Sequence, residues 1–126
     1  MVSKKPAKQR KETKEMHLHQ RKRLVSAHLS KELRDSLKKR SLAVRKGDTV
    51  KIMRGKYRGK TGKVVKVDLR KAKVYIEKLA RKKVDGTEVL IPFNASNLMI
   101  VGIDRSDEKR IKHGKKKIKE TKEKVK

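Results

Sequence analysis

Short apolar runs in which every second residue is hydrophobic occupy the middle of the chain. Each run is short and rich in β-branched residues, which is typical of half-buried strands. The pattern predicts five short antiparallel strands within residues 41–103 and therefore an all-β fold. Because a sheet this small needs its edges closed, it favours a small five-stranded barrel. The alternating positions are Val50 and Ile52, then Val65, Val67 and Leu69, then Val74 and Ile76, then Val89, Ile91 and Phe93, and finally Leu98 and Ile100.

The segments between these runs contain residues that favour turns. Residues 54–59 separate the first two predicted strands, and residues 68–73 separate the next pair. Asp85 and Gly86 predict a two-residue hairpin, because glycine tolerates the positive φ that such turns require. The glycines expected to permit tight turns are Gly47, Gly55, Gly59, Gly62 and Gly86.

Residues 1–40 predict a basic arm with one short helix. Ser30 is a suitable N-cap, and leucines recur every four residues on one helical face. Asp35 precedes Lys39 by four residues, a spacing that favours an ion pair. We therefore expect a helix over about residues 30–39. Its apolar face would consist of Leu29, Leu33 and Leu37.

The rest of the arm and the C-terminal tail contain few apolar side chains. Residues 4–14 and the basic cluster 20–23 are too polar to fold alone. The Lys-rich residues 104–126 are similar, although Lys/Glu-rich stretches can be partly helical. The sequence therefore predicts an arm over 1–40, a barrel over 41–103 and a basic tail over 104–126. We expect both extensions to become ordered against a partner.

The charge of the chain indicates what that partner is. Its 126 residues include 41 Lys and Arg but only 14 Asp and Glu, for a net charge of +27, and all three predicted parts are basic. This imbalance favours a polyanion, nucleic acid before an anionic membrane surface. No apolar run approaches the roughly 18 residues of a membrane span, and no signal peptide is predicted. The absence of cysteine excludes disulfides and thiol catalysis.

No arrangement of residues predicts an enzyme, a cofactor or a metal. Residues 55–61 resemble a phosphate-binding loop, but three residues rather than four separate Gly55 from Gly59, and a strand pattern follows instead of a helix. His17 and His19 lack a third ligand at a useful spacing, and we interpret them as imidazoles that face solvent or RNA. The acidic residues are dispersed among the bases and form no catalytic pair.

Residues 44–67 carry the strongest signal. A Lys-Gly-Asp turn leads into a strand, a basic loop bounded by glycines follows, and Gly-Lys-Val opens the next strand. This order resembles a KOW motif, in which backbone amides and cations approach phosphates. Tyr57 would either stack on a base or cover the end of the barrel. The cations of the motif loop are Arg54, Lys56, Arg58, Lys60 and Lys63.

The resemblance extends over about residues 18–112. It identifies the chain as similar to the archaeal and eukaryotic branch of the universal large-subunit ribosomal protein family twenty-four, whose eukaryotic counterpart is large-subunit protein twenty-six. One departure is Asn94-Ala95-Ser96, where relatives often have His-Pro-Ser. The matching segments are 21–34, 40–48, 74–77, 86–89 and 94–100.

The resemblance implies an SH3-like barrel that binds large-subunit (23S-type) rRNA directly, toward its 5′ region. It also implies an early role in subunit assembly and neighbouring large-subunit proteins near the polypeptide exit tunnel. We accordingly expect a cytoplasmic, ribosome-bound protein without membrane insertion or homo-oligomers. The side chains predicted to bind RNA are Arg21, Lys22, Arg23, Lys31, Arg34, Arg40, Arg45, Lys46, Lys51, Arg54, Lys56, Tyr57, Arg58, Lys60, Lys63, Arg81, Lys82 and Lys83.

Three other binding functions compete with this one. A KOW module of a transcription elongation factor would bind polymerase or nascent RNA, usually within a longer chain. A small chromatin protein would insert apolar side chains between base steps, whereas the loops here are basic and glycine-rich. A peptide-binding SH3 module needs an aromatic-lined groove, which three aromatic residues do not supply.

Overall fold

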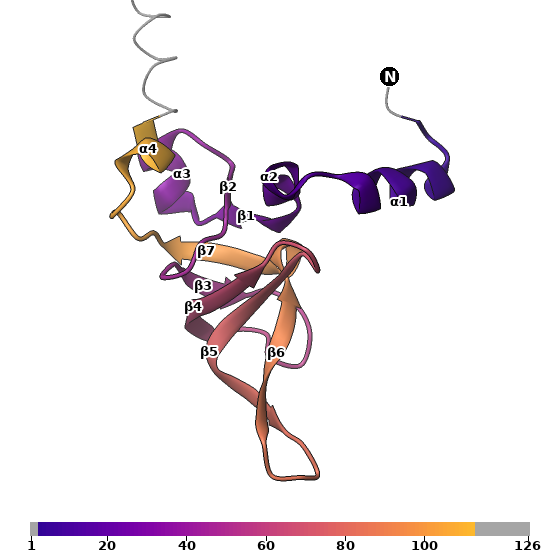
Figure 1. The fold of residues 1–126 in the computed structure, drawn as a ribbon. Helices are drawn as coiled ribbons and strands as arrows, with labels where there is room; N and C mark the ends of the chain where they lie inside the picture. Colours follow the sequence, from indigo (N-terminus) through magenta and orange to yellow (C-terminus); the bar gives the residue numbers. More distant parts are fainter. Residues whose placement is uncertain (1–2, 113–126) are drawn as a thin grey trace, which may run out of the picture.

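The computed structural model describes residues 3–112 and contains one seven-stranded sheet with short helices beside it (Figure 1). The strands follow the order β2-β1-β7-β3-β4-β5-β6. None of the helices in this part of the chain is both long and apolar enough to cross a membrane. The elements are α1 (Pro6–Glu15), α2 (Leu18–Arg21), the 3₁₀ helix η1 (Lys22–Val25), β1 (Ser26–Leu29), α3 (Lys31–Leu37), β2 (Ser41–Ala43), β3 (Thr49–Ile52), β4 (Thr61–Asp68), β5 (Lys73–Lys82), β6 (Glu88–Asn94), the 3₁₀ helix η2 (Ala95–Asn97), β7 (Leu98–Gly102) and α4 (Glu108–Lys112).

All five predicted strands are present, as β3 to β7, but the closed five-stranded barrel is not confirmed. Two further strands extend the sheet, because β1 pairs parallel with β7 and β2 pairs antiparallel with β1. Strands β2 and β6 form the two edges of the described sheet, which is open. A four-residue strand with only two apolar residues, Ala27 and Leu29, carries too short a pattern to be recognised in the sequence.

The core is built mainly from residues of β1, β3, β7 and the first part of β5. Val50 lies opposite Ile100, and Ile52 lies opposite Leu98. These four side chains are buried, as apolar residues on one face of a small sheet must be. The remaining buried apolar residues are Val25, Ala27, Leu29, Val44, Val64, Val74, Ile76, Leu79 and Ala95.

Two predictions for strand β4 are wrong: the inward position of Val65 and the turn at Gly62. Val64 is 2% exposed while Val65, expected inside, is 38% exposed, because a register shift between Val64 and Lys66 reverses the alternation. Gly62 lies inside this strand rather than in a turn. A Cβ atom there would lie 2.5 Å from Cγ2 of Ile76, so glycine is required by close packing.

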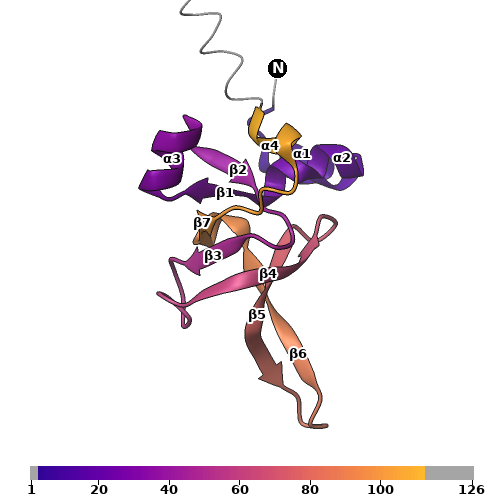
Figure 2. The same ribbon diagram turned by 90° about the vertical axis from the view of Figure 1, so that its left-hand side faces the viewer.

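The long hairpin of β5 and β6 projects away from α3 and α4 (Figure 2). Residues 83–87 connect the two strands, and a hydrogen bond between Lys83 and Thr87 leaves a three-residue loop, 84–86, in place of the predicted two. The Lys83 amide donates to the Thr87 carbonyl at 2.9 Å, and the Gly86 amide donates to the Lys83 carbonyl at 3.1 Å. Gly86 has φ +80°, which fits the left-handed position of a three-residue hairpin loop.

The predicted helix of the arm is confirmed as α3. Leu33 and Leu37 pack against the core, and Lys38 ends the helix in a left-handed conformation with φ 53°. Ser30 occupies the N-cap, but its hydroxyl makes no capping hydrogen bond. The expected ion pair between Asp35 and Lys39 is wrong; the Lys39 ammonium donates to the carbonyl of Arg110 at 3.3 Å.

The two ends of the described chain are more ordered than expected. Residues 4–14 were predicted not to fold alone, yet helix α1 covers Pro6–Glu15 with none of its residues buried. Pro6 suits the first turn, where its missing N–H costs nothing. Residues 104–112 turn back toward the start of β3 and end in α4. The rest of the predicted tail, residues 113–126, lies outside the described residues.

Candidate nucleic-acid interface

The loop of residues 53–60 joins β3 to β4 and is closed at its base by two backbone hydrogen bonds. The Ile52 amide donates to the Lys60 carbonyl at 2.9 Å, and the Gly59 amide donates to the Ile52 carbonyl at 2.8 Å. Gly55 and Gly59 have φ of +95° and +86°, a region that L side chains avoid. A hydrogen-bonded base and two left-handed glycines therefore define the shape of this loop.

The cations of this loop face solvent. Arg54, Lys56, Arg58 and Lys60 are exposed, and among residues 3–112 none of them forms an ion pair with an acidic side chain. Their donors are therefore available to an external anion. Of the two neighbouring predicted cations, Lys63 on β4 is exposed and Lys51 on β3 is half-buried.

Tyr57 turns inward from the same loop. Its ring is half-buried against the core and meets Phe93 edge to face, with centroids 6.0 Å apart and an angle of 83°. The ammonium of Lys60 lies 5.4 Å from the Tyr57 ring centroid. These contacts support the interpretation that Tyr57 covers the end of the sheet; stacking on a base stays a prediction.

Arg21 makes three hydrogen bonds within the chain. Its Nε and Nη2 donate to the carbonyls of Met16 at 3.1 Å and Lys14 at 2.7 Å, and its Nη1 donates to the carbonyl of Arg70 at 2.8 Å. One guanidinium thus joins the C-terminal end of α1 to the turn between β4 and β5. This geometry favours a structural role for a residue that the sequence placed in the RNA interface.

Two other predicted RNA-binding arginines also have internal partners. The Nε of Arg34 donates to the Leu29 carbonyl at 2.9 Å, and Arg45 forms an ion pair with Asp107. The other predicted cations of the arm and the following turn are exposed. They are Lys22, Arg23, Lys31, Arg40 and Lys46.

The tip of the β5–β6 hairpin brings a second group of predicted cations into solvent. Arg81, Lys82 and Lys83 are all exposed, and Val84 beside them is fully exposed. The hairpin leaves the rest of the sheet before these residues (Figures 1 and 2). The tip of the hairpin therefore presents a second group of exposed cations, away from the loop of residues 53–60.

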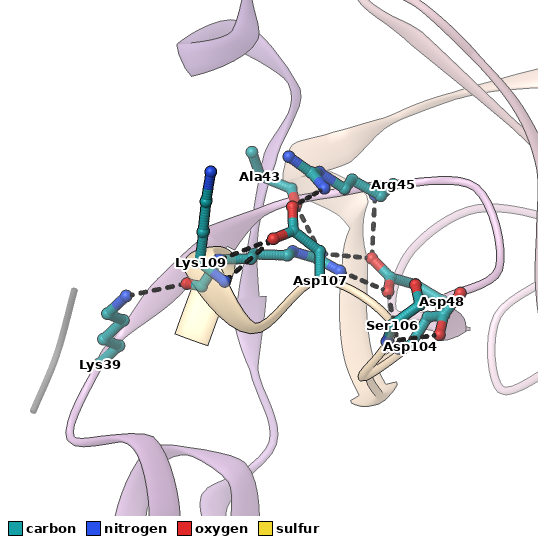
Figure 3. A network of polar contacts seen from close by, with 9 residues as sticks. Lys39, Ala43, Arg45, Asp48, Asp104, Ser106, Asp107 and Lys109 are labelled. Carbon is teal, nitrogen blue, oxygen red and sulfur yellow. Dashed lines mark hydrogen bonds and ion pairs between the residues drawn. The ribbon is translucent and has the colours of Figure 1, made fainter. Parts of the chain in front are cut away.

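A buried polar network holds the turn that precedes β3 (Figure 3). Asp48 is fully buried; its Oδ1 accepts from Arg110 Nη1 at 2.8 Å and from the Asp104 amide at 3.2 Å. Its Oδ2 accepts from Arg110 Nη2 at 2.5 Å and from the Arg45 amide at 2.9 Å. Four donors satisfy this carboxylate, as a buried charge requires.

The C-terminal segment encloses that turn from outside. Arg110 Nη2 also donates to the Ala43 carbonyl at 2.7 Å, and a Cβ atom at Gly47 would lie 2.9 Å from Oδ2 of Asp104. No spacing in the sequence predicts this contact, because Asp48 and Arg110 are 62 residues apart. Within the Lys-Gly-Asp turn, the missing side chain of Gly47 leaves room for Asp104, and Asp48 binds Arg110 and the Asp104 amide.

Two half-buried carboxylates have lowered pKa values. The hydrogen bond from Arg45 holds the pKa of Asp107 below its ordinary value of 3.8, aided by the backbone amides of Arg110 and Lys109. The backbone amide of Lys71, followed by that of Arg70, lowers the pKa of Asp68 in the same way. Both carboxylates are therefore ionised at neutral pH and fix local turns.

Comparison with known proteins supports the family resemblance that the sequence segments indicated. Residues 3–117 match the family model described as ribosomal proteins L26 eukaryotic, L24P archaeal. Over 112 residues the chain is 47% identical to the large ribosomal subunit protein uL24 of Methanothrix thermoacetophila, covering 89% of this chain and 97% of that protein. The chain therefore belongs to the ribosomal protein family that comprises eukaryotic L26 and archaeal L24P.

Proposed function

We propose that this protein is a structural constituent of the large ribosomal subunit that binds large-subunit rRNA directly, toward its 5′ region. It acts early in subunit assembly and lies among neighbouring proteins near the polypeptide exit tunnel. Family membership supports the ribosomal assignment, since the relative in Methanothrix thermoacetophila is itself a large-subunit protein. A net charge of +27 is consistent with a polyanionic partner.

The single observation that carries the proposal is the loop of residues 53–60. It holds four exposed cations without an acidic partner in the described chain, on a turn closed by hydrogen bonds to β3. A loop of fixed shape loses little conformational freedom when it meets RNA, so its cations meet phosphates at small entropic cost. Such contacts position the protein on folded RNA more than they read its sequence.

The remaining exposed cations extend the contact on either side. Those of the arm and of the β5–β6 tip lie on separate projections and reach different rRNA segments. Binding neutralises phosphates that otherwise repel one another, which favours compact rRNA. Each neutralised phosphate contributes roughly −0.7 to −0.9 to the slope of log affinity against log salt.

Cosedimentation and footprinting in cell extract test the proposal. We expect the chain to sediment with large subunits and to protect large-subunit rRNA toward its 5′ end from cleavage. Recovery with RNA polymerase or duplex DNA, and without ribosomal particles, would contradict the ribosomal assignment.

A further inference from the structure

An open apolar hollow lies between the N-terminal arm and the turn that joins β4 to β5. It has a volume of about 690 Å³, and its four lining residues are His17, Leu18, His19 and Leu69. We call it the histidine hollow. The two imidazole rings are nearly parallel, 6° apart, with centroids separated by 5.8 Å. Leu18 is 54% exposed, so much of its apolar side chain faces solvent at this hollow.

The hollow is built by contacts already present in the free protein. Arg21 bonds the carbonyls of Lys14 and Met16 on one side and that of Arg70 on the other. These bonds hold Leu18 beside Leu69, and Figure 1 shows α2 next to the β4–β5 turn. The His17 amide donates to Oε1 of Gln20 at 3.3 Å, which fixes the start of α2. A preformed surface binds with less ordering cost than one assembled on contact.

The surroundings of the hollow are cationic. Residues 14–23 and 68–71, the two segments that form the hollow, carry five exposed cations: Lys14, Lys22, Arg23, Arg70 and Lys71. The acidic residues of these segments are Glu15 and Asp68. Both carboxylates have partners: Asp68 accepts the amides of Arg70 and Lys71, and Glu15 lies 3.8 Å from Lys11. An apolar, ring-bearing surface with a cationic rim is complementary to a nucleotide, whose base is flat and whose phosphate is negative.

We propose that the histidine hollow binds one unstacked nucleobase of the rRNA, with the base against the imidazoles and Leu18 and its phosphates against the cationic rim. This inference rests on the proposed function and adds a base-contacting site that is separate from the loop of residues 53–60. Unpaired bases of folded RNA commonly stack on aromatic side chains, histidine included. Arg21 acts here as a positioning residue and does not contact the base.

A tryptophan reporter tests the site, because the natural chain contains no tryptophan. In Leu18→Trp the only indole would lie in the hollow; Val101→Trp places it on β7 as an exposed control. We expect purified large-subunit rRNA to quench the position-18 indole and to shield it from acrylamide, and to leave the control unchanged. Equal quenching at both positions, or none at position 18 while the variant still binds rRNA, would overturn the inference.

A second measurement does not depend on the reporter. The double variant His17→Ala, His19→Ala should bind rRNA about tenfold more weakly, a typical loss for one stacked base. Its salt slope should equal that of the unaltered protein, because no phosphate contact is removed. Affinity equal to that of a His28→Ala control would contradict the site.

The same measurements separate this site from the proposed function and from a protein partner. If the unaltered chain fails to bind rRNA, the proposed function itself is wrong. If rRNA binds at full affinity to the His17→Ala, His19→Ala variant, only the nucleobase site is wrong. Quenching of the position-18 indole that requires other ribosomal proteins, and not rRNA alone, would assign the hollow to a protein side chain and overturn the inference.

Discussion

The carboxylate of Asp48 and the guanidinium of Arg110 form a bidentate ion pair inside the protein, with side-chain exposures of 0% and 5%. The pair joins the turn before β3 to the helix α4, which follows the last strand. Both oxygens of Asp48 have additional backbone donors, so the carboxylate is fully satisfied only while the C-terminal segment is docked. The described fold is therefore closed by a segment that the sequence predicts as part of a basic tail.

Removing Arg110 should be costly. Arg110→Ala leaves Asp48 buried without its counter-ion, and breaking such a pair typically costs about 3–5 kcal/mol of unfolding free energy. We expect about 3 kcal/mol in urea titrations, the lower end, because a terminal segment can move away and admit water. Arg105→Ala, an exposed arginine in the same segment, should change stability by less than about 0.5 kcal/mol. A loss in Arg110→Ala no larger than in this control would show that the pair does not hold the turn.

The ion pair of Asp107 with Arg45 should make stability depend on acidity. Because the pKa of Asp107 is lowered in the folded state, its stabilisation is present above the ordinary value of 3.8 and is lost as pH falls through the lowered value. Urea midpoints of the unaltered chain and of Asp107→Asn should therefore differ by a constant amount near neutral pH and converge below about pH 4. A difference that persists undiminished at low pH would contradict this account.

Gly62 should tolerate no side chain while Ile76 lies against it. Gly62→Ala places a Cβ atom 2.5 Å from Cγ2 of Ile76, and overpacking of this kind costs about 1–3 kcal/mol. Ile76→Leu removes that branched methyl and keeps the volume, so the double variant should be more stable than the sum of the two single changes predicts. Strict additivity in urea unfolding would indicate that the two residues do not collide.

The hydrophobic pattern of the sequence predicts the elements whose apolar residues recur with a local period. It does not predict features that depend on contacts between residues far apart in the chain. The strands β3 to β7 and the helix α3 were predicted because their apolar periods are read within one element. The inward position of Val65 was wrong because of a register shift between Val64 and Lys66, which no period reveals, whereas Val67 packs against the core as predicted. Strand β1 was missed because its four residues carry too short a pattern and its parallel partner β7 lies about seventy residues later in the chain.

The candidate site shows the same division. Exposure of the cations in residues 53–60 follows from a polar, glycine-bounded loop between two strands. Composition alone does not distinguish a cation that faces solvent from one that holds the fold. Arg21, Arg34 and Arg45 look like their neighbours in the sequence, yet each donates to a partner fixed by the tertiary structure.

The different roles of Arg21 and Lys22 can be measured on adjacent residues. Arg21→Ala should lower hydrogen-exchange protection in α1, because the bonds to Lys14 and Met16 are lost, with a salt slope of rRNA binding close to that of the unaltered protein. Lys22→Ala should leave exchange unchanged and reduce the slope by about 0.7–0.9 if it meets one phosphate. If instead Arg21→Ala reduced the salt slope and Lys22→Ala lowered exchange protection, Arg21 would be the RNA ligand.

The most direct test of the central claim reverses the charge of the loop. In Arg54→Glu, Arg58→Glu, Lys60→Glu we expect rRNA binding to be lost while circular dichroism shows an intact fold, because at least three phosphate contacts are replaced by repulsion. The matched control Lys66→Glu, Arg105→Glu, Lys109→Glu changes net charge equally at exposed positions outside the predicted interface, and it should retain binding with a modest loss. Unaltered binding by the loop variant, or an equal loss in both variants, would contradict the account.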